Sequence, residues 1–139
     1  MASAPSARRC ETVSVAKAKR PRERWKDEPE EQDFPAAIDY LSLSFPEPVA
    51  ALIVESLRNA PTMYRKAKDL LRAARLELLP DDDPEVARDL KKVARGEALS
   101  PVLLVRGAPL FVADGYHRIC ASYHLAEDAE IPCRLVDMP

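Results

Sequence analysis

The chain has 139 residues and a formal net charge of −2, and 47% of its residues are hydrophobic and 32% are charged. This composition provides for one hydrophobic core and argues against general binding to nucleic acid, which needs a basic balance. No apolar run approaches the roughly 20 residues that span a bilayer. The three cysteines include no Cys-x-x-Cys pair, which excludes a disulfide framework and a cysteine zinc site. We expect a protein of the reducing cytoplasm that is not a membrane protein.

Residues 1–33 combine a basic block, which ends at Lys26, with the acidic block that follows it. Neither block has enough apolar residues to form a core, so we predict a disordered charged tail at 1–33 and one domain at 34–139. The tail is either a solvated segment whose charges partly cancel or a basic arm for nucleic acid or a protein partner, with Trp25 stacking on a base. Trp25 docking on the domain is a third alternative, and the acid-poor start also allows an organelle transit peptide.

The first patterns of the domain predict a strand and then two helices. Apolar residues alternate with serines over 38–45, which is typical of a strand. Prolines then start a helix over 49–59, and a basic amphipathic helix is expected over 63–79. The inward residues of the first helix would be Val49, Leu52, Ile53 and Leu57. The inward residues of the second would be Met63, Ala67, Leu70, Leu71, Ala74 and Leu78. Its outward cations, which either contact phosphates or form an ordinary solvated face, are Arg65, Lys66, Lys68, Arg72 and Arg75.

Three consecutive aspartates, Asp81 to Asp83, allow two interpretations. Carboxylates suit hard cations, which would make these residues metal ligands. Alternatively, Asp83 caps a helix that has Pro84 at its first position, Glu85 in its first turn and Gly96 just after its end. We favour the helix start. The inward residues of this helix would be Val86, Leu90, Val93 and Ala94.

The remaining patterns complete a small mixed sheet. The continuous apolar run at 102–105 is typical of a strand buried on both faces, and a turn leads from it to a hairpin partner at 110–113. A helix follows to about Leu125, and the chain ends in a strand at 131–136. We therefore predict an α+β fold in which helices surround these strands and the one expected at 38–45.

The turn between the hairpin and the last helix is the candidate site. Glycine can adopt positive φ or allow a close approach, and the first turn of a helix has amides without internal partners, so the turn could hold an anion. His117 and Arg118 lie where the helix dipole disfavours cations, which also favours a neighbouring anion such as phosphate. The expected phosphate-binding residues are Asp114, Gly115, Tyr116, His117 and Arg118.

Each polar side chain of the turn has an expected role. Arg118 would bind phosphate bidentately, and His117 would donate to phosphate or exchange a proton. Asp114 would hold Mg²⁺, accept from a ribose hydroxyl or act as a base. Alternatively, Asp114 caps the helix and pairs with Arg118, while His117 donates to a backbone carbonyl. The sequence contains no Walker-type loop or other catalytic motif, so catalytic residues are unassigned. Carboxylates that could fold beside the turn are Asp39, Glu47 and Glu97.

Asp114 to Arg118, followed by a short helix and the Ile-Pro strand that begins near Glu130, resembles the superfamily of ParB-type N-terminal domains and sulfiredoxins. The segment from Gly96 to Val105 is similar to the Gly-x-Leu-Gln-Pro-Ile-x-Val box of ParB proteins, with Ser100 in place of glutamine. The resemblance implies a ParB/sulfiredoxin-like fold. The superfamily includes nucleotide-binding partition proteins, a sulfinic acid reductase, a free-serine kinase and reported nucleases, so the resemblance implies a fold more than a reaction.

Two departures from the superfamily narrow the expected function. Tyr116 stands where sulfiredoxins have their catalytic cysteine, and Cys120 falls on the buried helix face, so reductase chemistry is not expected. No glutamate follows Gly115, unlike in the Gly-Glu-Arg-Arg box of ParB-like CTPases. We expect binding of a phosphate-bearing ligand of the nucleotide class, for which Mg²⁺ is the candidate cofactor. Whether the protein is an enzyme is left open, with phosphoryl transfer or hydrolysis as the candidate reactions. The alternatives are a non-enzymatic regulatory or interaction protein that uses the basic tail, and a ParB-like nuclease.

Overall fold

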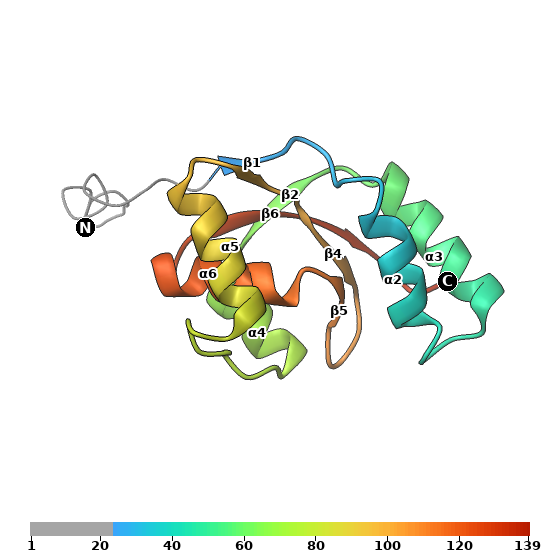
Figure 1. The fold of residues 1–139 in the computed structure, drawn as a ribbon. Helices are drawn as coiled ribbons and strands as arrows, with labels where there is room; N and C mark the ends of the chain where they lie inside the picture. Colours follow the sequence, from blue (N-terminus) through green and yellow to red (C-terminus); the bar gives the residue numbers. More distant parts are fainter. Residues whose placement is uncertain (1–23) are drawn as a thin grey trace, which may run out of the picture.

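The computed structural model describes residues 24–139, and they form an α+β fold around a mixed four-stranded sheet (Figure 1). The strands are β1 (Arg24–Trp25), β2 (Met63–Lys66), β3 (Ala98–Leu99), β4 (Val102–Val105), β5 (Phe111–Asp114) and β6 (Glu130–Val136). The order in the sheet is β2-β6-β4-β5, in which β6 and β4 are parallel and the two outer pairs are antiparallel. Strands β1 and β3 form a separate parallel pair. The predicted class and the predicted strands at 102–105, 110–113 and 131–136 are confirmed.

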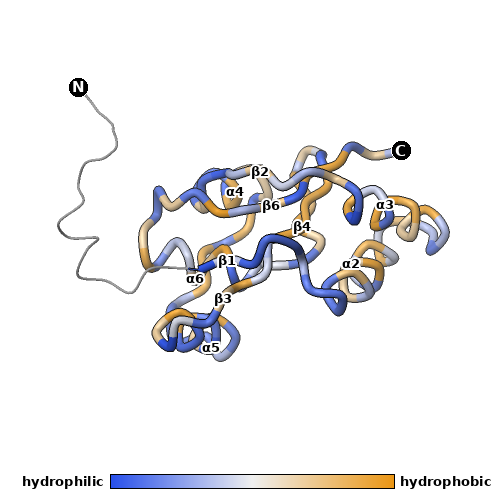
Figure 2. Tube along the Cα trace, turned by 90° about the horizontal axis from the view of Figure 1, so that it is seen from above, coloured by the Kyte–Doolittle hydropathy of each residue, from blue (hydrophilic) through white to orange (hydrophobic). Residues whose placement is uncertain are grey.

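Helices cover both faces of the sheet (Figures 1 and 2). They are α2 (Asp33–Leu41), α3 (Glu47–Asn59), α4 (Ala67–Ala74), α5 (Pro84–Ala94) and α6 (Tyr116–Leu125). Val102 and Leu104 of β4 pack in one apolar cluster with α4, α5 and α6, whereas Leu103 and Val105 pack in a second cluster with α2 and α3. Successive side chains of a strand point to opposite faces, so the apolar run of β4 belongs to a strand buried on both sides, as predicted.

The start of α5 confirms the capping interpretation of the aspartates. Asp83 Oδ2 accepts hydrogen bonds from the backbone amides of Glu85, at 3.1 Å, and Val86, at 3.2 Å. The helix ends at Ala94, and Gly96 follows with a φ of +78°, a conformation that suits glycine after a helix. Within residues 24–139, no group of three or more His, Cys, Asp or Glu is arranged to hold a metal ion.

The strand predicted at 38–45 is wrong, because this part of the chain is the second half of α2 and the turn that follows it. Phe34, Ala37 and Leu41 are buried at helical spacing, whereas Leu43, whose alternation suggested a strand, is 83% exposed. The buried residues of this helix begin at Phe34, upstream of the stretch 38–45 in which apolar residues and serines alternate. The alternation therefore described a solvent-exposed turn and not a half-buried strand.

The helix predicted at 63–79 is half wrong. Its first four residues form β2, and only Ala67–Ala74 are helical. Met63 to Lys66 pair in register with Cys133 to Glu130 of β6. This pairing supplies backbone partners from about 70 residues away, so it overrides the local pattern. The expected inward residues of the remaining helix are buried, apart from Leu78, which lies beyond its end and is 38% exposed.

The helix predicted at 49–59 is confirmed as α3, with a corrected inward face. Ala50, Ile53, Val54 and Leu57 are buried, whereas Leu52 is 63% exposed. The buried set has the spacing i, i+3, i+4, i+7 and includes a small alanine that was passed over as a core residue. In α5, Val86 and Val93 face inward as expected, but Ala94 is exposed.

Residues 24–33, which we assigned to the tail, contact the domain. Arg24 and Trp25 pair with β3, and Trp25 packs against the cluster formed with α4, α5 and α6. Trp25 therefore docks on the domain, which was one of the three alternatives for it. The rest of the expected tail, residues 1–23, lies outside the described residues, and its predicted disorder and basic-arm role stay predictions. No described helix has the length and apolar character needed to cross a membrane.

Candidate functional site

The turn between β5 and α6 needs glycine because the protein itself fills the space beside it. Gly115 has a φ of +113°, which L side chains rarely adopt. A Cβ added there would lie 2.4 Å from Val102 Cγ1 and 3.0 Å from Arg118 Nη2. The close approach that the glycine allows is thus made by β4 and Arg118. An anion would have to sit on another side of the turn.

Arg118 lies on the first turn of α6 and forms an ion pair with the end of β5. Its Nη2 donates to Asp114 Oδ2 at 2.9 Å and, more weakly, to the carbonyl oxygen of Pro101 at 3.4 Å. The two charged side chains are only 16% and 20% exposed. The pairing that we considered as an alternative is therefore present. The capping is not, since Gly115 is the N-cap and no described side chain bonds to the first turn there.

The other two residues of the turn face different surroundings. The Tyr116 hydroxyl donates to the carbonyl oxygen of Glu77 at 2.6 Å, which links its side chain to the loop after α4. The ring of His117 stacks at a tilt on that of Tyr116, with centroids 5.5 Å apart. The hydrogen bond from His117 to a backbone carbonyl, which was the alternative role for this residue, is not found among the described residues. His117 lies near enough to Asp89 in α5 to act on the pKa of its carboxyl, which it lowers.

A polar hollow of about 130 Å³ lies between α5, α6 and the N-terminal segment. Of the five residues expected at the site, Arg118 alone lines it. Asp114, which accepts from the Arg118 guanidinium, does not line the hollow. Its charged lining residues, three cations and three carboxylates, are Lys26, Lys92, Arg118, Glu30, Asp89 and Glu97. Glu97 was among the carboxylates considered, whereas Asp39 and Glu47 are exposed on α2 and α3 and do not line the hollow.

Asp89 is the least usual of these lining residues. It is only 8% exposed, and its carboxylate has no hydrogen bond or ion pair with any residue of the described chain. Burial raises the pKa of Asp89, and the charges of Arg118, Lys92 and His117 oppose this rise. The oxygens of Asp89 are not among the buried unpartnered atoms, so they are open to the hollow, where a ligand could donate a hydrogen bond to them.

The remaining charges of the hollow fall into satisfied and unsatisfied groups. Glu30 pairs with Lys26, and Glu97 pairs with Arg95 at 2.6 Å, which lowers the pKa of both carboxyls. Lys92 has no ion pair with another described residue. The Nε of Arg118 is buried and has no hydrogen-bond partner, the one such side-chain atom in residues 24–139. The hollow therefore offers an unpaired cation, Lys92, beside the unpaired carboxyl of Asp89, whereas the Nε of Arg118 has almost no accessible surface.

Two further carboxyls, those of Asp33 and Asp114, lie near the hollow but do not line it. Asp33, at the start of α2, is 5% exposed, and its Oδ2 accepts from the Glu30 amide at 3.0 Å and from the Ser100 hydroxyl. The Asp33 carboxyl also lies near enough to Asp114 to influence its pKa. Burial and the neighbouring Asp33 raise the pKa of Asp114, and Arg118 opposes this rise. These contacts connect Arg118 with the N-terminal segment through buried polar groups.

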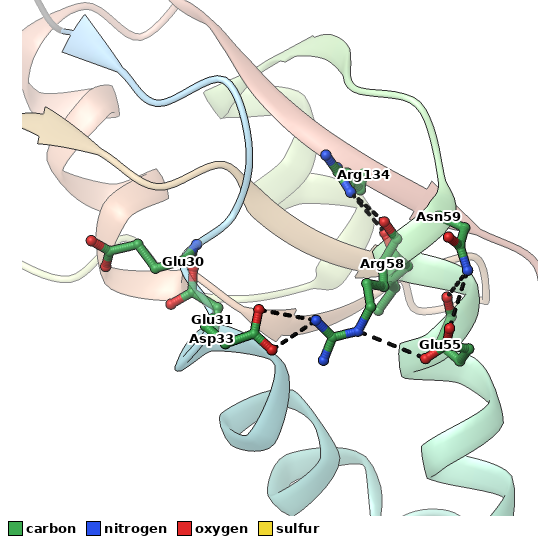
Figure 3. A network of polar contacts seen from close by, with 8 residues as sticks. Glu30, Glu31, Asp33, Glu55, Arg58, Asn59 and Arg134 are labelled. Atoms are coloured by element: carbon green, nitrogen blue, oxygen red, sulfur yellow. Dashed lines mark hydrogen bonds and ion pairs between the residues drawn. The ribbon is translucent and has the colours of Figure 1, made fainter.

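The N-terminal segment that contributes Lys26 and Glu30 to the lining of the hollow forms one wall of it, and this wall is held at both ends. At one end, the Lys26 amide donates to the carbonyl oxygen of Leu99 at 2.8 Å, next to the β1–β3 pair. At the other end, Glu31 accepts two hydrogen bonds from Arg58, at 2.8 and 3.0 Å (Figure 3). In Figure 3 the side chain of Glu30 points away from this network. The wall is thus held in place independently of any ligand.

Most lining residues were missed in the sequence because they come from three separated segments. Lys26 and Glu30 fell in the presumed tail, and nothing local relates them to Arg118. One signal was available for Asp89. It lies three residues after Val86 and four before Val93, on the apolar face of α5, where a charged residue is out of place.

Comparison with protein-family models finds none that matches the chain, and comparison with curated proteins and with solved structures finds no significant match. The resemblance to ParB-type domains and sulfiredoxins therefore rests on the quoted motifs alone and stays a prediction. The functional argument depends on the hollow and the residues that line it.

Proposed function

We propose that the protein binds a phosphate-bearing small molecule of the nucleotide class and that the phosphate occupies the hollow between Lys92 and Arg118. The observation that carries the proposal is that two cations, Lys92 and Arg118, line one hollow, and that Lys92 has no ion pair among the described residues. Phosphate oxygens accept several charge-assisted hydrogen bonds at once, so one phosphate would use both groups.

The size of the hollow limits what it can enclose. Its volume of about 130 Å³ is well below the roughly 300 Å³ at which pockets for drug-sized ligands begin. The proposal therefore places the phosphate end of the ligand inside and the remainder, such as a nucleoside, over the rim. Phosphoryl transfer or hydrolysis stays a prediction from the resemblance, since no residue is placed against a reacting atom.

Mg²⁺ would accompany a nucleotide on the nucleotide's own phosphates. The described residues do not fit an ion held by the protein, because Asp114, the carboxylate expected to hold it, already pairs with Arg118. The interaction-protein alternative depends largely on residues 1–23. It gains no support from the cations of α4, where Lys68 and Arg72 pair with Asp128 and Asp69.

The test is thermal unfolding of the full chain with CTP, ATP, GTP and their diphosphates, each with Mg²⁺. A ligand that binds only the native state at 100 times its Kd stabilises it by about 2.7 kcal/mol, which raises Tm by several degrees. Lys92→Ala should weaken binding about tenfold, because one charge-assisted hydrogen bond is lost. Lys91→Ala, on the exposed side of the same helix, should leave it unchanged. If none of these nucleotides raises Tm at millimolar concentration, the proposal is wrong.

A further inference from the structure

Phosphate binding leaves one buried group of the hollow unused. Asp89 is 8% exposed and lines the hollow, yet no described residue donates a hydrogen bond to it. A phosphate dianion does not satisfy a carboxylate, because the two groups repel each other and neither can donate. A purely anionic ligand would therefore use the cations and be disfavoured by Asp89.

No role in folding accounts for this carboxyl. Asp83, at the start of the same helix, accepts hydrogen bonds from two backbone amides and is explained by capping. Asp89 lies in the middle of α5, where amides are already used by the helix, and neighbouring Val86 and Val93 form the apolar face. An asparagine there would cost less to bury.

The position of Asp89 relative to the cations defines where its partner would lie. Asp89 and Lys92 are three residues apart on α5, so their side chains share one face, and the charge of Arg118 reaches Asp89 from α6. His117 and Glu85 are the other charged or titratable residues that act on it. Atoms bonded next to a phosphate held by Lys92 and Arg118 would thus lie beside Asp89.

We infer that Asp89 is a specificity-determining residue, which accepts a hydrogen bond from an ammonium or hydroxyl group carried by the ligand a few bonds from its phosphate. This inference rests on the proposed function and deepens it. The ligand class becomes a phosphate ester with a nearby donor, and simple phosphates are disfavoured by the unpaired carboxylate. The phosphate then serves Lys92 and Arg118, while the donor serves Asp89.

The test compares three small probes of nearly equal size by titration calorimetry at pH 7.5. Phosphoethanolamine carries an ammonium two carbons from the phosphate ester oxygen, 2-hydroxyethyl phosphate carries a hydroxyl there, and ethyl phosphate has neither. A hydrogen bond to a charged group that is missing in the weaker probe corresponds to about tenfold in Kd. We expect at least one of the two donor probes to bind about tenfold more tightly than ethyl phosphate, and the tighter one identifies the donor.

Asp89→Asn separates recognition from a structural role. We expect this variant to bind phosphoethanolamine more weakly and ethyl phosphate as well as, or better than, the unchanged chain, because the repulsive charge is gone. Damage to the fold would weaken both probes together. Asp89→Leu, which cannot accept a hydrogen bond, should remove the preference for the hydroxyl probe. Asp82→Asn, in the exposed loop before α5, is the control.

The outcomes distinguish this inference from the proposed function. If ethyl phosphate binds as tightly as both donor probes, or if the preference survives in both Asp89 variants, the inference is overturned while phosphate binding stands. If none of the three probes binds and the nucleotides also fail, the proposed function is wrong and the inference falls with it.

Discussion

Two charged side chains of this protein are equally buried, one on each side of the sheet, but only one of them has hydrogen-bond partners. Arg134 and Asp89 are each 8% exposed. Arg134 donates from Nη1 to the carbonyl oxygens of Leu57, at 3.3 Å, and Arg58, at 2.8 Å (Figure 3). Its Nε donates to the Thr62 hydroxyl at 3.4 Å. Asp89 has no hydrogen-bond partner among the described residues. Burial alone therefore does not tell a structural charge from a functional one, and the presence of partners does.

The contrast extends to the surroundings of the two residues. Arg134 closes the C-terminal end of α3, whose last carbonyls have no partners within the helix, and its charge suits the negative end of the helix dipole. Around it lie Arg58, paired with Glu31 and stacked 4.2 Å above the ring of Phe34, and a closed apolar cluster. The side with α5 and α6 instead contains an open hollow and the unpaired Nε of Arg118. One side is complete without a ligand, whereas the other is not.

The substitution with the largest expected effect tests whether the turn at Gly115, on the side of the sheet with α5 and α6, is rigid. Gly115→Ala forces positive φ on a residue with a Cβ and drives that Cβ into Val102, 2.4 Å away, so we expect a loss of about 3 to 4 kcal/mol in the free energy of unfolding. Urea denaturation measures it. Gly96→Ala is the control, since it also has positive φ but nothing within 4 Å, and should cost only about 1 kcal/mol. Equal losses would show that Val102 yields and that the turn is soft.

The sequence predicted the parts of this side that depend on local signals. Asp83, Pro84 and Gly96 mark the ends of α5, and Gly115 marks the start of α6, because capping and positive φ are properties of single positions. The hollow was not predictable in the same way. It joins Lys26 to residues about 65 to 90 positions away, and only the folded backbone brings them together.

The elements that were missed failed for the same reason. β2 is a strand because β6 pairs with it, which the helical pattern of residues 63–79 could not reveal. On α3, the prediction chose Leu52 over Ala50 as a core residue, since large apolar side chains are the usual guide to burial. Ala50 is fully buried in the apolar cluster that α2 and α3 form with the sheet. Burial of Asp33 and Ser100 likewise depends on contacts across the fold.

The prediction with the next largest effect measures how much Arg134 contributes to the free energy of unfolding. Arg134→Met keeps the length of the side chain but leaves the carbonyls of Leu57 and Arg58 without their donor, so we expect a loss of about 2 to 3 kcal/mol. The measurement is again urea denaturation. Arg106→Met is the control, because its ion pair with Asp137 is exposed and should contribute less than about 1 kcal/mol. A loss no larger than that of the control would place Arg134 with the ordinary surface charges and remove the comparison.

The smallest expected effect is an increase in stability, and it comes from replacing Asp89. Burial raises the pKa of its carboxyl above the ordinary value of 3.8, so the folded state binds this proton more tightly than the unfolded state does. Below pH 3.8 both states are protonated and Asp89 costs little. As the pH rises through 3.8 and the raised folded pKa, the folded state must pay for an unpaired buried charge, and stability falls. Asp89→Asn removes this charge, so at pH 7 it should raise the free energy of unfolding by about 1 kcal/mol, or Tm by about 3 to 6 °C.

The pH dependence identifies the cause of that gain. Thermal unfolding of both proteins should give Tm values that converge as the pH falls towards 3.8 and separate as it rises to 7, whereas Asp82→Asn should follow the unchanged chain throughout. A phosphate ester that supplies a donor to Asp89 should narrow the difference at pH 7, because it stabilises only the chain that keeps the carboxylate. If Asp89→Asn instead lowers Tm at pH 7, the carboxylate stabilises the free protein. Asp89 would then belong with Arg134 among the structural charges, and the hollow would have no group that awaits a donor.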